Sequence, residues 1–179
     1  MNAAVNAFFL ILKLLSLYFL VVSLFSLCKR KMQKSSTTQR RFAVLIAARN
    51  EESCIAGLIE SLLAQNYPSE LFDIWVLPNN CTDHTADAAR HAGGKVLEMP
   101  TSIHSKGAAL QYAANTLLHG SRYYDAFCVF DADNEVDPAF LSEMNQALSR
   151  SAIVKSRILA KNRMQAGISA CYEIYFCTA

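Results

Sequence analysis

Residues 42–52 read FAVLIAARNEE, and this stretch decides the fold class. Its first six residues form a continuous apolar run with β-branched members, which is typical of a strand buried on both faces of a sheet. Polar residues follow at once, beginning with Arg49. Because a strand covered on both faces needs helices on both sides, the stretch favours an α/β protein with a mostly parallel sheet.

The rest of the domain repeats this alternation of strands and helices. Further strands are predicted at residues 72–77, 95–98, 126–130 and 151–160. Helices are predicted over 51–65, from Thr82 or Asp83 to about His91, and onward from Ser105, Pro138 and Gln165. In such sheets ligands bind beyond the carboxyl ends of the strands. Polar clusters follow the first, second and fourth strands, at 49–51, 79–80 and 131–133.

The strongest chemical signal is the pair of carboxylates in FDADN, residues 130–134. Side chains at i and i+2 of an extended backbone point the same way, and two like charges repel unless a cation lies between them and a ligand. Mg²⁺ or Mn²⁺ takes carboxylate oxygens and completes its shell with water and phosphate oxygens. Since an apolar strand comes directly before the pair, a metal site at Asp131 and Asp133 is favoured over a solvated acidic loop.

Residues 1–28 predict one transmembrane helix, because the apolar run 3–28 is long enough to cross a hydrocarbon core of about 30 Å. Lys13 lies inside this run and either snorkels to the outer interface, which we favour, or faces another helix together with Asn6. The segment 29–41 is a basic juxtamembrane linker that carries Lys29, Arg30, Lys31, Lys34, Arg40 and Arg41. The positive-inside rule then places the domain on the cytoplasmic side of the cell membrane.

The charge balance of the domain excludes one class of partner. The chain has 17 Lys and Arg, 15 Asp and Glu and a formal net charge of +2. Seven of the 17 basic residues precede residue 42, so the domain 42–179 carries ten against all 15 acidic residues, a net −5. A nucleic-acid-binding body would normally show a basic face, so no nucleic-acid partner is expected. The six cysteines have no C-x-x-C spacing and are expected to be free thiols.

Four stretches together resemble a known family: FAVLIAARNEE, VLPNNCTDHTADAAR, SKGAALQYAA and FDADNEVDPAFL. In this order and spacing they are similar to family 2 glycosyltransferases of the GT-A fold, and to the membrane-linked, processive-like members among them. The resemblance covers about residues 42–162. It implies a Rossmann-like, mostly parallel sheet with helices on both faces. It also implies metal-assisted, inverting transfer of a sugar from a UDP-sugar to a lipid or polysaccharide acceptor, with Mg²⁺ or Mn²⁺.

The resemblance also implies donor-binding residues. The base and ribose would contact Ala47, Arg49, Glu51, Asn79 and Asp83. The diphosphate, the metal and the donor sugar would contact Lys106, Gly107, Asp131, Asp133, Arg157, Lys161 and Asn162. Asn79 departs from the family, which usually has an Asp that reads uracil; the amide carbonyl of Asn79 can still accept a hydrogen bond from uracil N3–H.

The general base that an inverting transfer needs is not found among these residues. Asp137 precedes Pro138 and is expected to cap a helix instead. We therefore expect the base beyond residue 179, and the domain 42–179 to be an incomplete, N-terminal part of the enzyme. Two alternatives stay open. One is a non-catalytic donor-binding fragment, and the other is a haloacid-dehalogenase-type phosphatase, which the residues Asn134-Glu135 after the carboxylates disfavour.

Overall fold

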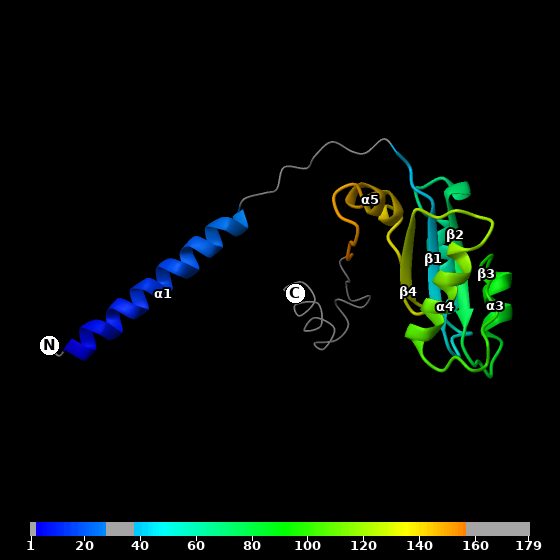
Figure 1. The fold of residues 1–179 in the computed structure, drawn as a ribbon, viewed down its shortest axis with the longest axis horizontal. Coiled ribbons are helices and arrows are strands. Elements are labelled where there is room, and N and C mark those ends of the chain that lie inside the picture. Colours follow the sequence, from blue (N-terminus) through cyan, green and yellow to red (C-terminus); the bar gives the residue numbers. More distant parts are fainter. Residues whose placement is uncertain (1–2, 28–37, 157–179) are drawn as a thin grey trace. The chain divides into compact units, whose positions relative to one another are not determined.

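The computed structural model describes residues 3–27 and 38–156, and the chain divides into two compact units, 1–35 and 36–179. The first unit contains one helix, α1 (Ala3–Leu27), drawn in blue in Figure 1. Within it, Val5–Leu24 has a mean hydropathy of 2.4 and is long and apolar enough to cross a membrane. The predicted helix is confirmed; that it crosses the membrane rests on its length and composition.

The second unit is built on a four-stranded sheet in the order β3-β2-β1-β4 (Figure 1). The strands are β1 (Phe42–Ala48), β2 (Phe72–Pro78), β3 (Lys95–Val96) and β4 (Ala126–Asp131). All three neighbouring pairs are parallel, as the alternation of strands and helices predicts. The apolar stretch that opens the domain is therefore the inner strand between β2 and β4.

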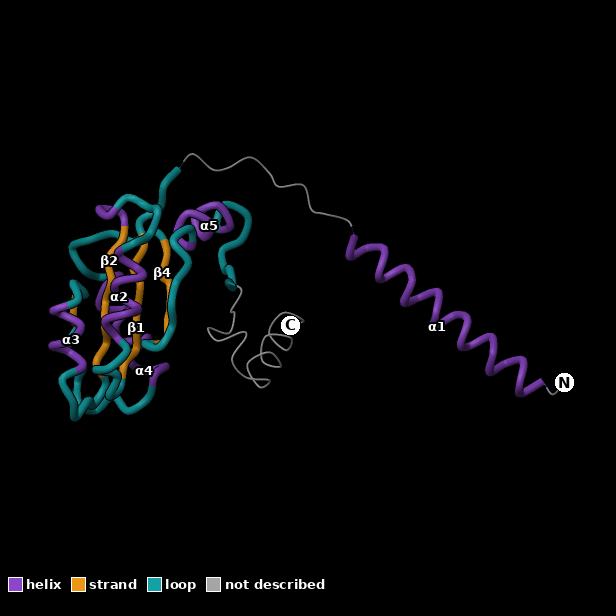
Figure 2. The backbone as a smooth tube through the Cα atoms, turned by 180° about the vertical axis from the view of Figure 1, so that it is seen from behind, coloured by secondary structure: helices purple, strands orange, loops and turns teal. Residues whose placement is uncertain are grey.

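Helices cover both faces of this sheet. On one face α2 (Ile55–Leu63), α3 (Thr85–His91) and α5 (Phe140–Ala147) contribute to one apolar core. Figure 2, seen from behind, shows α2 lying over the strands. The other face is covered by α4 (Lys106–Leu118). A short 3₁₀ helix, Ser69–Leu71, leads into β2.

Successive residues of β1 point to opposite faces of the sheet and are buried in the two apolar cores in turn. Because both faces are covered, the sequence of β1 is apolar without interruption. Val44 and Ile46 are fully buried in the core with α2, where Leu58 and Leu62 meet them. Ala43 and Leu45 lie in the core with α4. The strand is fixed in place from both sides, so the loops that leave its carboxyl end start from a rigid base.

Several predicted boundaries shift. Helix α2 begins at Ile55 instead of residue 51, because the N–H groups of Cys54 and Ile55 turn back to the carbonyl of Glu51. Likewise α3 begins at Thr85, not at residue 82 or 83, and α5 begins at Phe140, not at Pro138. In each case a polar turn precedes the helix, and apolar spacing alone does not mark where the turn ends.

The predicted strand 151–160 is wrong over its described part. Residues 151–156 form no strand, and Ile153 is 90% exposed. β-Branched residues favour a strand only where a neighbouring strand offers pairing and packing, which these six residues lack. Residues 157–160 and the predicted helix from Gln165 lie outside the described residues.

The described end of the juxtamembrane linker, residues 38–41, is bound to the domain. The backbone N–H of Arg40 donates to Asn145 Oδ1 over 3.1 Å, and its guanidinium donates to the Asn145 carbonyl over 2.8 Å. The N–H of Arg41 donates to Asp125 Oδ2 over 2.7 Å. These two arginines of the basic cluster therefore have partners within the domain.

Candidate functional site

The register of the sheet brings three polar clusters to one edge. Ala47 pairs with Asp131, and Ala48 pairs with Pro78, so β1, β2 and β4 end at the same level. The N–H of Asn79 then donates to the Ala48 carbonyl over 2.9 Å and continues the ladder by one step. Residues that are up to 84 positions apart thus meet at the carboxyl edge, as the sequence predicts.

The strand order places a ligand crevice at this edge. From β1 the chain runs outward through β2 and β3, and then returns to the other side of β1 as β4. Parallel α/β sheets bind ligands where the chain reverses in this way. The reversal lies between β1 and β4, so the loop after β1 and the two aspartates at the end of β4 flank the crevice.

A braced turn holds the two aspartates. Asn134 Oδ1 accepts a hydrogen bond from the N–H of Asp131 over 3.2 Å, and the N–H of Asn134 donates to the Asp131 carbonyl over 3.2 Å. The amide of Asn134 also donates to Asp133 Oδ1 over 3.3 Å. Between the aspartates, Ala132 is buried at 4% exposure. Both carboxylates therefore stand exposed on a turn whose backbone is already ordered. The extended backbone expected across Asp131 and Asp133 is not present, because β4 ends at Asp131 and residues 132–133 form the turn.

The start of α4 faces this turn. The helix starts at the predicted place, and Ser105 is its N-cap, because its hydroxyl accepts a hydrogen bond from the N–H of Ala108 over 3.2 Å. The ammonium group of Lys106, the first residue of the helix, forms an ion pair with Asp131 Oδ1. A Cβ on Gly107 would meet no described atom within 4 Å, so the helix start opens onto free space.

Asp83 and Thr85 tie the loop after β1 to the loop after β2. The Thr85 hydroxyl, which is fully buried, accepts a hydrogen bond from the N–H of Glu51 over 2.9 Å. The carboxylate of Asp83 accepts from the N–H groups of Thr85, over 3.1 Å, and Glu52, over 3.2 Å. The hydrogen bond from the Thr85 side chain is the main reason that the pKa of Asp83 is lowered. Asp83 thus lies at the edge as a brace between loops.

Glu51 is also held through its side chain. The thiol of Cys54 donates to Glu51 Oε2 over 2.9 Å. This hydrogen bond, followed by burial, raises the pKa of Cys54 to about 11, so the thiol stays protonated at neutral pH. Next to it, a cleft of about 550 Å³ extends from the start of α2 to Asp133 and Glu135. Cys54 and Thr85 give no motif in the sequence, since each acts through a contact with Glu51.

Asn79 is buried at 7% exposure with its carbonyl engaged. Asn80 Nδ2 donates to the backbone carbonyl of Ile103 over 2.7 Å, which fixes the orientation of the Asn80 amide. The same nitrogen lies 2.9 Å from Asn79 Oδ1 and donates to it. Asn50 and Asn80 both have positive φ angles, 59° and 51°, which Asn tolerates better than most residues. The two asparagine turns shape the loops that end β1 and β2.

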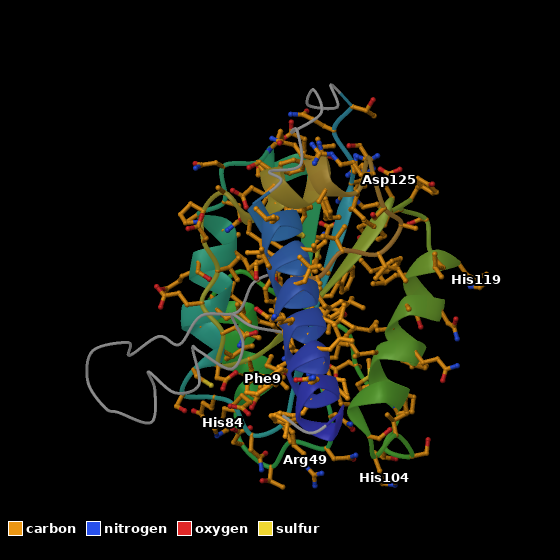
Figure 3. All side chains as sticks on the ribbon, turned by 90° about the vertical axis from the view of Figure 1, so that its left-hand side faces the viewer. Phe9, Arg49, His84, His104, His119 and Asp125 are labelled. Atoms are coloured by element: carbon orange, nitrogen blue, oxygen red, sulfur yellow. The ribbon has the colours of Figure 1, made fainter. Side chains whose placement is uncertain are left out.

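Nine of the predicted residues lie at or beside this edge: Ala47, Arg49, Glu51, Asn79, Asp83, Lys106, Gly107, Asp131 and Asp133. Figure 3 shows Arg49, His84 and His104 at the end of the domain opposite Asp125, which precedes β4. Arg157, Lys161 and Asn162 lie outside the described residues.

The donor set suits a hard divalent cation. Within 3–27 and 38–156, no group of three or more His, Cys, Asp or Glu residues is placed to hold a metal. Asp131 and Asp133 present two exposed carboxylates, and most of the coordination shell of a metal bound by them would be water and phosphate. Mg²⁺ is typically bound in this way, through one or two carboxylates and the phosphates of the substrate.

Two solved structures share the fold. A mannosyltransferase from Pyrobaculum calidifontis, solved in complex with GDP-Man and Mn²⁺, has a TM-score of 0.62 and 18% identity, covering 79% of this chain and 43% of that one. A crystal structure of TarS 1–349 from S. aureus has a TM-score of 0.51 and 21% identity, covering 61% of this chain and 32% of that one. They support the expected GT-A architecture.

Sequence comparison points the same way. A beta-monoglucosyldiacylglycerol synthase from Synechocystis sp. is 26% identical over 153 residues, which are 79% of this chain and 32% of the relative. This chain therefore spans about a third of the length of that curated relative. Residues 43–173 match the family described as Glycosyl transferase family 2. Because this match covers most of the chain and includes every strand of the sheet except the first residue of β1, the chain belongs to glycosyl transferase family 2.

Proposed function

We propose that this chain is the nucleotide-sugar-binding part of an inverting glycosyltransferase that uses a UDP-sugar and a divalent cation. The observation that carries the proposal is the pair Asp131 and Asp133, exposed on a braced turn beside Lys106 at the carboxyl edge. The transferred group would be a hexosyl or N-acetylhexosaminyl residue. The aspartates bind the metal, and Asp131 also contacts the ribose.

The diphosphate of the donor is bound at the start of α4. The first N–H groups of a helix have no partner within it and attract anions, and the ammonium of Lys106 adds a full positive charge there. Gly107 leaves room for the phosphates to approach the backbone. The base and ribose are then held by Ala47, Arg49 and Glu51 of the β1 end and by Asn79 of the β2 end.

A bound Mg²⁺ or Mn²⁺ would act as a Lewis acid that neutralises charge on the departing diphosphate. The described residues supply binding and orientation for this chemistry. Asp137 does not cap α5 as expected, because the helix begins at Phe140 with Ala139 as its N-cap and no side-chain cap. Its carboxylate instead accepts the N–H of Ala139 over 2.8 Å in the turn before the helix, and we do not assign it as the general base. We still expect the base beyond residue 179.

The acceptor is a lipid or a growing polysaccharide at the cytoplasmic face of the cell membrane. The name of the Synechocystis relative, a synthase of monoglucosyldiacylglycerol, supports a lipid acceptor. The apolar helix α1 and the basic residues that follow it support a membrane-bound enzyme with its domain on the cytoplasmic side. The phosphatase alternative is dropped, because the chain belongs to a glycosyltransferase family and the first aspartate of the pair ends the fourth strand.

Calorimetry on the 179-residue chain in detergent tests the proposal. We expect UDP to bind only when Mn²⁺ is present, and Asp131→Ala and Asp133→Ala each to weaken that binding roughly 10- to 100-fold or more, as for lost metal-site groups. Glu143→Gln, which removes an exposed carboxylate of α5, is the matched control and should bind as the wild type does. Unchanged binding by both aspartate variants would disprove the metal assignment.

A transfer assay on the same samples separates an enzyme from a binding fragment. Mn²⁺-dependent UDP binding without sugar transfer supports the donor-binding fragment, and transfer by the 179-residue chain contradicts the expectation that the base lies beyond it. Competition with GDP and CDP measures how strictly the site with Asn79 selects uracil.

A further inference from the structure

Lys106 forms an ion pair with Asp131, one of the two carboxylates that would bind a metal. Its ammonium pairs with Asp131 Oδ1, although the two residues are 25 positions apart and belong to different elements. Two carboxylates, those of Asp131 and Asp133, share one turn, and neither is buried. A single positive charge at Asp131 reduces the repulsion between them without neutralising the pair.

The rest of this site is already ordered around the ion pair. Asn134 holds the backbone of Asp131 on both its N–H and its carbonyl, and it also holds the carboxylate of Asp133. Ser105 fixes the start of α4. Exchange of one cation for another at Asp131 therefore requires only rotation of the Lys106 side chain, with no movement of strand or helix.

We propose that Lys106 is the resident counter-cation of the Asp131–Asp133 pair, and that it leaves Asp131 for the donor diphosphate when a divalent metal binds. This inference rests on the proposed function of the site. The metal replaces one positive charge with two at the carboxylates, and the released ammonium gains a new anionic partner only if a diphosphate is present. Lys106 thus disfavours metal without nucleotide and favours the two together.

The exposures make the exchange feasible. The side chain of Lys106 is 48% exposed and that of Asp131 is 61% exposed, so water can solvate both groups as they part. Ion pairs at such exposed positions are weak, and a lysine ammonium on a four-carbon stem reorients readily. A fully buried pair would instead hold its partners together and would compete too strongly with a metal.

The exchange of Lys106 for a metal has a thermodynamic consequence that a purely phosphate-binding lysine would not produce. Mn²⁺ and UDP should each raise the affinity for the other by the same factor, since coupling between two ligands is reciprocal. Part of that factor comes from the displaced ammonium. Removal of Lys106 should therefore weaken UDP binding and, at the same time, strengthen the binding of Mn²⁺ alone.

The test measures free Mn²⁺ by electron paramagnetic resonance with the 179-residue chain in detergent, with and without UDP. Without nucleotide, Lys106→Met should bind Mn²⁺ roughly fivefold more tightly than the wild type, the factor expected for loss of an exposed ion pair. Lys106→Arg keeps the charge and should keep the wild-type affinity. Arg90→Met removes a positive charge and two exposed ion pairs, with Asp87 and Glu98, so it controls for net charge.

The outcomes separate this inference from the proposed function. Equal or weaker Mn²⁺ binding by Lys106→Met, with Mn²⁺-dependent UDP binding intact in the wild type, overturns the counter-cation role and leaves the proposed function standing. Tighter binding by Arg90→Met to the same extent also overturns it, because the effect would then be one of net charge. A wild-type chain that binds no Mn²⁺ even with UDP overturns both.

Discussion

Two aspartates at opposite ends of the sheet have opposite surroundings. Asp73, near the amino end of β2, has a side chain that is 6% exposed. Its carboxylate pairs with Lys95 Nζ over 2.7 Å and with Arg122 Nε over 3.0 Å, and it accepts a hydrogen bond from the Tyr124 hydroxyl over 2.7 Å. The Tyr124 hydroxyl in turn accepts a hydrogen bond from Trp75 Nε1 over 3.2 Å.

Asp131, at the carboxyl end of β4, has one ion-pair partner within the described residues, Lys106, and a side chain that is 61% exposed. The contrast shows how one residue type can serve two purposes in one sheet. A buried carboxylate must be fully paired, and removal of its partners is costly. An exposed carboxylate contributes little to stability and keeps its oxygens available for a ligand. The following predictions test this division through the free energy of unfolding, measured by denaturant titration of the 36–179 unit within the full chain.

Asp73→Asn should have the largest effect. It leaves Lys95 and Arg122 without their carboxylate, and we expect a loss of about 2–3 kcal/mol. This is less than for a fully buried pair, because both basic side chains are partly exposed and can reach water. UDP binding by the folded fraction should be unchanged. A loss below about 0.5 kcal/mol would mean that the Asp73 cluster is no more structural than a surface ion pair.

Thr85→Val should have the second-largest effect on the free energy of unfolding. The substitution keeps the size of the side chain but leaves the N–H of Glu51 and the carboxylate of Asp83 without the buried hydroxyl. We expect a loss of about 1–2 kcal/mol, typical of a buried hydrogen bond left unmade. Thr85→Ser restores the hydroxyl and should recover most of it. If Val and Ser variants are equally stable, the hydroxyl does not brace the two loops.

Acidification should have a smaller effect, because protonation of Asp73 removes its charge and keeps the side chain in place. Burial raises the pKa of Asp73, but hydrogen bonds from Lys95 and Tyr124 and the charges of Lys95 and Arg122 outweigh it, and the pKa is lowered. A lowered pKa in the folded state stabilises the protein above the unfolded value of about 3.9, and this stabilisation is lost as the pH falls through the folded value. As the pH drops below about 4, the free energy of unfolding of the wild type should thus decrease, and that of Asp73→Asn should decrease less steeply. Equal slopes of unfolding free energy against pH in the wild type and Asp73→Asn would contradict this role of Asp73.

Asp131→Asn should have the smallest effect on folding, within about 1 kcal/mol of the wild type. The same variant should lose Mn²⁺-dependent UDP binding, which calorimetry measures. Asp131→Asn should thus change UDP binding strongly and the free energy of unfolding only slightly. Asp73→Asn should do the reverse. A strongly destabilised Asp131→Asn would show that the exposed pair with Lys106 is structural and would remove the contrast between the two ends.

Much of the fold could be predicted from the sequence, because its signals are local. The apolar run 42–47, the helical spacing of Leu58 and Leu62 and the Gly93-Gly94 stop after α3 each mark an element within a few residues. The paired carboxylates after β4 are equally local. The strand predicted at 151–156 is wrong because that prediction also used only local sequence. A short apolar stretch forms a strand only when a partner strand lies beside it.

The sequence by itself determined the alternation of strands and helices, the parallel sheet and the identity of the two exposed aspartates. Only the tertiary structure decided which side chains meet: Lys106 with Asp131, Thr85 with Glu51, and Asp73 with Arg122. These pairs are 25, 34 and 49 residues apart. Periodicity reports the burial of one face over a few turns or strand residues, whereas such contacts depend on the order and register in which distant elements pack.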